Sequence, residues 1–339
     1  MIKQIDGLSL YRFHKLTLEV EHLSKINHKN FNSALPITLI FLCVFLSSIK
    51  LTWAEEKVND SASKESSPKE TTAKELPKAD INSIEPPIAL TKQHKEDLQH
   101  YLAKEQVRPL LAGPDDYITL VQKYTSANSK GVAILLPEWQ QGATNPKAIN
   151  YLRNTLPSQG WNTISIQPNN KPENFPSIAL TASEQIKENE LILTQYKRKL
   201  GTLFNAVMNT AKEYPGIVLV IAQGNNGALL IDIFSQEKIQ QPNALILLSS
   251  YLQSNYDLVD SVNENFAHQL ALSEMPVLDL YLKLDNPLVL AKASQRKLMA
   301  TQEMKTYYRQ RQLNNTITGY YPEKELLSQI NGWLKAIGW

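Results

Sequence analysis

The body of the chain alternates between two hydrophobic patterns. Short continuous apolar runs, such as GVAILLP at 131–137 and NALILLS at 243–249, are typical of strands that are buried on both faces. Longer stretches place apolar residues every three to four positions. The clearest, at 182–214, predicts a long helix with one buried face. Because strands and helices alternate, we expect an α/β fold built on a mostly parallel, doubly wound sheet with helices on both faces.

The same patterns give the expected order of elements. We expect strands at 116–124, 131–137, 161–168, 243–249, 276–284 and 306–313, and another that begins at 217. We expect helices at 97–111, 145–156, 182–214, 287–304 and 323–337, one from the turn after 223 to about 236, and a helical region that reaches about 272. The alternating polarity of 116–124 predicts a half-exposed edge strand.

The stretch Ile217–Leu230, IVLVIAQGNNGALL, joins an apolar strand to a helix through a tight turn. In α/β-hydrolases such a strand, turn and helix form the nucleophile elbow, with the nucleophile at the apex between small residues. On that template Ala222 takes the first small position and Gly224 takes the apex, with Asn226 and Gly227 beyond it. A glycine has no side chain, so this apex carries no nucleophile.

An uncharged apolar run of sixteen residues, Ala34–Ile49, follows a segment that carries several lysines and an arginine. A basic segment, an apolar core and a small residue such as Ala54 before a polar stretch are typical of a secretion signal. We therefore expect a signal over 1–54 that is cleaved after Ala54. The alternative is an uncleaved membrane anchor, although a spanning helix prefers about 20 apolar residues.

The segment 55–87 is rich in Lys, Glu, Ser, Thr and Pro, which predicts a disordered tether before a folded domain at 88–339. The formal net charge is +2, and without residues 1–54 the chain has 29 basic and 30 acidic residues, so we expect no nucleic-acid partner. The single cysteine, Cys43, lies in the apolar run. The body therefore has no disulfide and no cysteine nucleophile.

Six segments in order identify a family. They are LLPEW, LPSQGWNTISIQP, AQGNNGA, VLDLYLKLDNP, YRQRQL and INGWLKAIG. Together they resemble the DUF3530 family of uncharacterised bacterial proteins, over about 91–339. The resemblance implies an α/β-hydrolase-like fold, an export signal and no established activity.

A serine hydrolase needs a nucleophile, an acid and a histidine, in that order along an α/β-hydrolase chain. The histidine belongs in the loop after the last strand, and residues 310–319 contain none. His268 follows the elbow but comes too early, so we interpret it as a helix-face residue. Asp285 stands where the acid belongs, but without a base to orient we expect it to cap the helix that begins at Pro287. Conventional acyl-transfer catalysis is therefore not expected.

Other candidate groups give weaker signals. Ser249 and Ser250 end a strand but have no histidine expected nearby. Asp279 lies six positions before Asp285, and we interpret it as a strand-centre polar group bonded to a neighbour. The chain has no HExxH motif and no Asp/His cluster, so we expect no metal and no cofactor.

The backbone of the elbow can still form an oxyanion hole, with one N–H at Asn225 and another near Glu138 and Trp139. Ligands of open α/β sheets bind at the carboxyl ends of the strands. We therefore expect a ligand-binding crevice, and the residues assigned to it are Glu138, Trp139, Gln223, Gly224, Asn225, Asn226 and Asp285. The alternative is that these residues only satisfy one another and the turn.

The sequence therefore predicts an exported, non-catalytic protein of the periplasm. Its expected partner is a small molecule or an envelope component, and it meets the membrane only if the N-terminal segment is not cleaved. The alternative is an esterase-like hydrolase with an unconventional site, in which Asp285 activates a water.

Overall fold

The structure, a computed structural model, describes residues 88–236 and 239–339. The secretion signal expected at 1–54, with Cys43, and the tether expected at 55–87 lie outside the described residues and stay predictions. Within 88–236 and 239–339, no helix combines the length and the apolar character that crossing a membrane requires.

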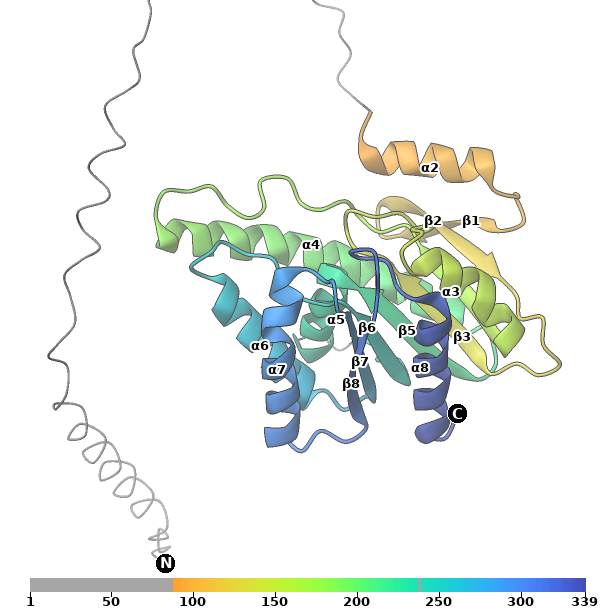
Figure 1. Ribbon diagram of the computed structural model, residues 1–339. Coiled ribbons are helices and arrows are strands. Elements are labelled where there is room, and N and C mark those ends of the chain that lie inside the picture. Colours follow the sequence, from red (N-terminus) through yellow and green to blue (C-terminus); the bar gives the residue numbers. More distant parts are fainter. Residues whose placement is uncertain (1–87, 237–238) are drawn as a thin grey trace, which may run out of the picture. The chain divides into compact units, whose positions relative to one another are not determined.

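An eight-stranded sheet forms the centre of the body, in the order β1-β2-β4-β3-β5-β6-β7-β8 (Figure 1). β2 runs antiparallel to both of its neighbours, and every other pair is parallel. The strands are β1 (Val107–Ala112), β2 (Asp115–Gln122), β3 (Gly131–Leu136), β4 (Trp161–Ile166), β5 (Ile217–Gln223), β6 (Ala244–Leu248), β7 (Val277–Leu282) and β8 (Tyr308–Leu313).

Helices cover both faces of this sheet, which confirms the predicted architecture (Figure 1). α3 and α8 pack on one face, and α4, α5, α6 and α7 lie on the other. The helices are α2 (Leu90–Tyr101), α3 (Ile149–Thr155), α4 (Ala182–Ala211), α5 (Gly224–Gln236), α6 (Val259–Leu272), α7 (Pro287–Gln302) and α8 (Glu323–Ala336), and a 3-10 turn spans Leu156–Gln159.

Two predictions near the start of the body were wrong. The expected helix at 97–111 is instead the end of α2 followed by β1, and Pro109 lies within that strand. The strand expected at the edge, 116–124, is β2, which lies inside the sheet between β1 and β4. β1 lies at the edge of the sheet, and an edge strand tolerates a proline and needs little apolar character. Its hydrophobic pattern therefore did not resemble that of a strand.

α4 begins and packs as its sequence indicates. Thr181 caps the helix by accepting a hydrogen bond from the backbone N–H of Glu184, and its own hydroxyl donates to the Glu184 carboxylate, which orients the cap. Every third or fourth residue from Tyr196 to Met208 is buried against the sheet. This packing brings the Tyr196 hydroxyl to Asn226 at the start of α5, at 2.8 Å.

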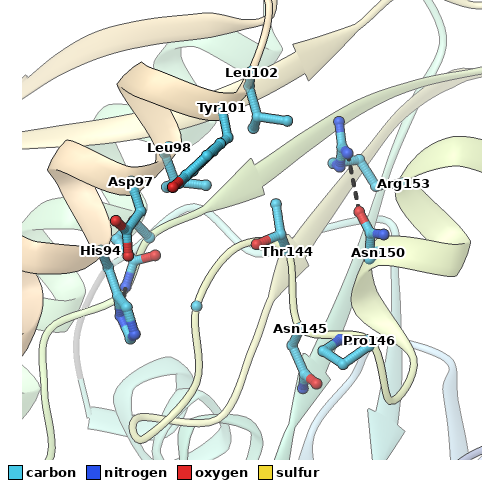
Figure 2. Close-up of a pocket in the computed structure, with 12 residues that line it drawn as sticks. His94, Asp97, Leu98, Tyr101, Leu102, Thr144, Asn145, Pro146, Asn150 and Arg153 are labelled. Atoms are coloured by element: carbon cyan, nitrogen blue, oxygen red, sulfur yellow. Dashed lines mark hydrogen bonds between the residues drawn. The ribbon is translucent and has the colours of Figure 1, made fainter.

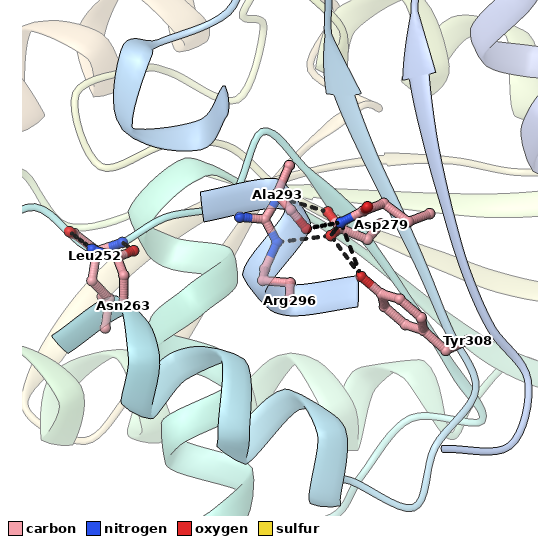
Figure 3. Close-up of polar contacts among 7 residues, drawn as sticks. Leu252, Asn263, Asp279, Ala293, Arg296 and Tyr308 are labelled. Atoms are coloured by element: carbon pink, nitrogen blue, oxygen red, sulfur yellow. Dashed lines mark hydrogen bonds and ion pairs between the residues drawn. The ribbon is translucent and has the colours of Figure 1, made fainter. Parts of the chain in front are cut away.

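A fully buried ion pair joins β7 to α7. Arg296 Nε donates to Asp279 Oδ2 over 2.8 Å, and both side chains are 0% exposed. Tyr308 and Gln310 of β8 donate to the same carboxylate oxygen, each over 2.9 Å (Figure 3). Asp279 is thus a strand-centre group bonded to its neighbours, as expected, but the sequence pattern did not reveal its partner Arg296.

Candidate functional site: the crevice above Gly224

The turn after β5 has the geometry of the elbow. β5 ends at Gln223 and α5 begins at Gly224, whose φ of 58° lies in the left-handed region. A Cβ on Gly227, one turn further along, would meet the Ser250 hydroxyl and would lie 3.1 Å from the Ala222 carbonyl oxygen. The close contact of α5 with the sheet therefore requires the small residues that the sequence provides.

The Glu138 side chain fills the space above the apex. Its Oε2 accepts the backbone N–H of Asn225 over 2.5 Å, and its Oε1 accepts the Asn225 side-chain amide over 3.3 Å. A Cβ on Gly224 would collide with the Glu138 carboxylate. The chain therefore places a carboxylate where an active hydrolase begins its nucleophile, and that carboxylate already uses the backbone donor that follows the apex.

Burial raises the pKa of Glu138 to about 7. The amide and backbone N–H of Asn225, the backbone N–H of Trp139 and the charge of Lys147 each lower the pKa and offset part of this rise. Both backbone donors that were expected to form an oxyanion hole thus interact with a carboxylate of the chain itself. Glu138 therefore changes its charge near neutral pH.

Asp285, which follows β7, accepts a hydrogen bond from Ser249, whereas the acid of a hydrolase triad accepts one from a histidine. Ser249 follows β6 with a φ of 49°, and its hydroxyl donates to Asp285 Oδ2 over 2.5 Å. The Tyr321 hydroxyl lies 2.5 Å from the same Ser249 oxygen. Tyr321 comes after β8, in the part of the chain where a hydrolase has its histidine. Burial, and then the charge of Asp285, raise the pKa of the Tyr321 hydroxyl well above its usual value, so it is no base at neutral pH.

The expectation that Asp285 caps the next helix was wrong. The Asn286 side chain is the cap of α7, and it accepts the Leu288 N–H over 2.9 Å. Asp285 instead accepts the N–H of Leu282 over 2.8 Å and that of Asn286 over 2.7 Å. The turn after β7 directs the Asp285 carboxylate back toward the strand end, and the next residue is left to cap the helix.

A cavity of roughly 430 Å³ lies over these groups at the carboxyl ends of β3, β5, β6 and β7. Four residues of the expected crevice line it, namely Glu138, Gln223, Gly224 and Asp285. The other lining residues are Gln140, Gln141, Lys147, Ser249, Tyr251, Asn286, Pro287, Thr318 and Gly319. Sequence reasoning missed Lys147 and Tyr251, because they lie on loops with no motif of their own.

The other three expected residues support the crevice from below. The Trp139 side chain is 2% exposed and packs edge-on against Phe175 and Tyr196. Asn226 is fully buried, and its amide donates to the Pro137 carbonyl over 2.8 Å. The Asn225 side chain is buried, and its oxygen accepts the Gln253 N–H over 2.7 Å. Whether the crevice holds a ligand stays a prediction.

The remaining candidates lie elsewhere. His268 is exposed on α6, as a helix-face residue would be. Ser250 is buried, and its hydroxyl has no hydrogen-bond partner in the described part of the chain. Across residues 88–236 and 239–339, His, Cys, Asp and Glu form no group of three that could hold a metal ion.

Solved structures that resemble this fold include hydrolases. Esterase 2 of Thermogutta terrifontis, in a form phosphoramylated by tabun, matches with a TM-score of 0.50 at 12% identity, over 70% of this chain and 97% of the esterase. A dienelactone hydrolase from Anabaena variabilis matches with a TM-score of 0.46 at 11% identity, over 68% of this chain and 98% of that one. An α/β serine hydrolase homologue from Coxiella burnetii matches with a TM-score of 0.45 at 10% identity, over 70% of this chain and 100% of that one. At these identities the likeness concerns the fold.

The search of curated proteins finds no match. A family model described as "Protein of unknown function (DUF3530)" matches residues 36–200 and 203–336. With the strand order, the elbow and the match to the esterase, this confirms both the family and the fold expected from the sequence. The chain belongs to the DUF3530 family and has the α/β-hydrolase fold.

Proposed function

We propose that this protein is an exported, non-catalytic binding protein that holds a ligand in the crevice above Gly224. The observation that carries the proposal is the Glu138 carboxylate, which occupies the space above the apex and accepts the backbone N–H of Asn225. Acyl transfer needs that donor for the developing oxyanion. An occupied donor and a missing nucleophile together favour binding over catalysis.

The groups around Ser249 support the same conclusion. Its hydroxyl is a nucleophile only if a neighbouring base takes its proton. Asp285 accepts three hydrogen bonds in all, and the Tyr321 hydroxyl keeps its proton because its pKa is raised. The cluster therefore stabilises the mouth of the crevice and supplies no activated group.

The lining of the cavity suggests the kind of ligand. Amides, hydroxyls and two carboxylates surround it, with Lys147 as a cation. Such a lining suits a hydrogen-bonding small molecule or a polar component of the cell envelope, because each polar group needs a partner when a ligand excludes water.

The alternative function is an esterase-like hydrolase, as the similar esterase of Thermogutta terrifontis is by its description. In that case Asp285 would activate a water. The geometry gives this alternative less support, because both Asp285 oxygens already accept hydrogen bonds from Ser249, Leu282 and Asn286.

Ester turnover and active-site labelling separate the two functions. The full chain should not hydrolyse p-nitrophenyl esters above the buffer rate, and a fluorophosphonate should leave no adduct in a mass spectrum. Glu138→Ala should be equally inactive, because freeing the Asn225 N–H supplies no nucleophile. Turnover that is lost in Asp285→Asn or in Ser249→Ala would overturn the binding proposal.

Ligand binding by the crevice is tested with a matched pair of glycine variants. In a thermal-shift screen of neutral sugars, which carry no carboxylate, a hit that binds in the crevice should be lost in Gly224→Ser, whose side chain enters the space that Glu138 occupies. Gly332→Ser on α8 is the control, because a Cβ there meets no atom within 4 Å. A hit that survives Gly224→Ser lies outside the crevice.

Export is tested at the N-terminus. Mass spectrometry of the protein from its native cells should find a mature chain that begins at Glu55, and that chain should be released with the periplasmic fraction. An intact 34–49 segment in the membrane fraction would indicate an anchored protein instead.

A further inference from the structure

A second cavity, of roughly 420 Å³, lies between α2, the loop 142–146 and α3. Figure 2 shows α2 on one side with His94, Asp97 and Tyr101, and α3 on the other side with Arg153. No motif in the sequence pointed to this cavity. It is distinct from the crevice above Gly224, because the two cavities share no lining residue, although different residues of the loop after β3 line each of them.

Arg153 is a buried cation on the wall of this cavity. Arg153 is 4% exposed. Its guanidinium donates to Gln106 Oε1 over 3.2 Å and to Asn150 Oδ1 over 2.9 Å. With its amide oxygen facing Arg153, Gln122 accepts a further hydrogen bond from Nη1 over 2.8 Å. Every one of these partners is an uncharged amide.

Among residues 88–236 and 239–339, the positive charge of Arg153 therefore has no counter-ion. No Asp or Glu of the described residues forms an ion pair with it, and its Nε is buried without a hydrogen-bond partner. Desolvation lowers the pKa of the guanidinium, which remains charged at neutral pH. Arg296, which is also deeply buried, has Asp279 as its counter-ion. Since an uncompensated buried charge is unfavourable, Arg153 is suited to receive an anion.

The rest of the wall limits the size and charge of that anion. Leu98 of α2 and Leu102, directly after it, offer an apolar surface, and the Thr144 and Tyr101 hydroxyls offer hydrogen bonds. Asp97 is exposed and lines the same cavity, so its charge opposes a second negative charge on a ligand. A guanidinium presents a fork of donors that matches a carboxylate.

We propose that this cavity is a binding site for a small organic monocarboxylate, whose carboxylate pairs with Arg153 and whose apolar part lies along Leu98 of α2 and Leu102, which follows it. This inference is independent of the proposed function of the crevice.

The test compares carboxylates with their amides. Isothermal titration of the full chain with butyrate and benzoate should give saturable binding about 10- to 100-fold tighter than with butyramide and benzamide, which have the same shape without the charge. Arg153→Gln should abolish this preference. Arg198→Gln is the matched control, because Arg198 is exposed on α4 and lies outside the cavity.

A second variant keeps the test valid if Arg153→Gln fails to fold. Thr144→Phe places a ring in the cavity from a half-buried loop position and leaves the hydrogen bonds of the guanidinium in place. It should lower carboxylate affinity at least about tenfold with an unchanged circular dichroism spectrum. Equal binding of acid and amide, unchanged binding in Thr144→Phe, or no saturable binding of either acid would overturn the proposal. Gly224→Ser should leave carboxylate binding unchanged, which separates this site from the crevice.

Discussion

Asp279 and Glu138 are two carboxylates that differ in how they are buried and in what they bind. Asp279 lies in the middle of β7 and meets the guanidinium of Arg296, so charge is neutralised within the core (Figure 3). Glu138 follows the end of β3, is half-buried beside a cavity, and has N–H groups of Asn225 as its direct partners. The first carboxylate holds the structure together, whereas the second remains able to change its charge near neutral pH.

The difference follows from position in the sheet. The centre of a parallel strand is covered by helices on both faces, so a charge there needs a partner from a neighbouring element. At the carboxyl ends of the strands, loops and helix N-termini supply N–H donors and leave open space. An acid whose direct partners are N–H groups therefore marks the candidate site at this end of the sheet more clearly than an acid inside it.

Breaking the ion pair should have the largest effect. Arg296→Met leaves the Asp279 charge buried and unpaired, so it should lower the free energy of unfolding by about 3 to 5 kcal/mol in chemical denaturation. The double variant with Asp279→Leu should recover much of this loss, since neither charge remains. A loss below about 1 kcal/mol in the single variant would show that the pair does not stabilise the core.

A side chain at the apex should have the next largest effect. Gly224→Ala adds a Cβ at a left-handed position and against the Glu138 carboxylate, so we expect a loss of about 2 to 3 kcal/mol in unfolding free energy. In a Glu138→Ala background the collision is absent, and the cost should fall to about 1 kcal/mol. Additive effects of the two substitutions in this double-mutant cycle would contradict the contact.

Removing the charge of Glu138 should have a smaller, pH-dependent effect. The folded-state pKa is raised from 4.5 to about 7, so the folded protein retains a proton that the unfolded chain releases in this window. The free energy of unfolding should therefore fall as pH rises from about 4.5 to 7. Since Glu138 is half-buried, we expect the fall to be about 1 to 3 kcal/mol.

The check is a series of denaturation curves between pH 5 and pH 8. Glu138→Gln should remove this part of the pH dependence and should be the more stable protein at pH 8. Glu173→Gln, at an exposed position, should keep the dependence of the unmodified protein. Parallel pH profiles for Glu138→Gln and the unmodified chain would contradict the raised pKa.

The order of strands and helices could be predicted from the sequence alone, because continuous apolar runs and 3.6-residue stripes record which faces are buried. The elbow at Gly224 and the absence of a histidine after the last strand could also be predicted, since both are properties of chain order. It failed at β1, where an edge strand with a proline needs no apolar pattern.

The contacts between polar groups, in contrast, depend on the folded arrangement of the chain. Glu138 and Asn225 are 87 positions apart, and Ser249 and Tyr321 are 72 apart, so no local pattern could pair them. Their contacts depend on the parallel register that aligns the strand ends and on loop conformations that carry no periodic signal. The same reason applies to the charges of the interior. Arg296 pairs with a carboxylate, whereas Arg153 lines a cavity. The packing of the helices on the sheet decides this difference.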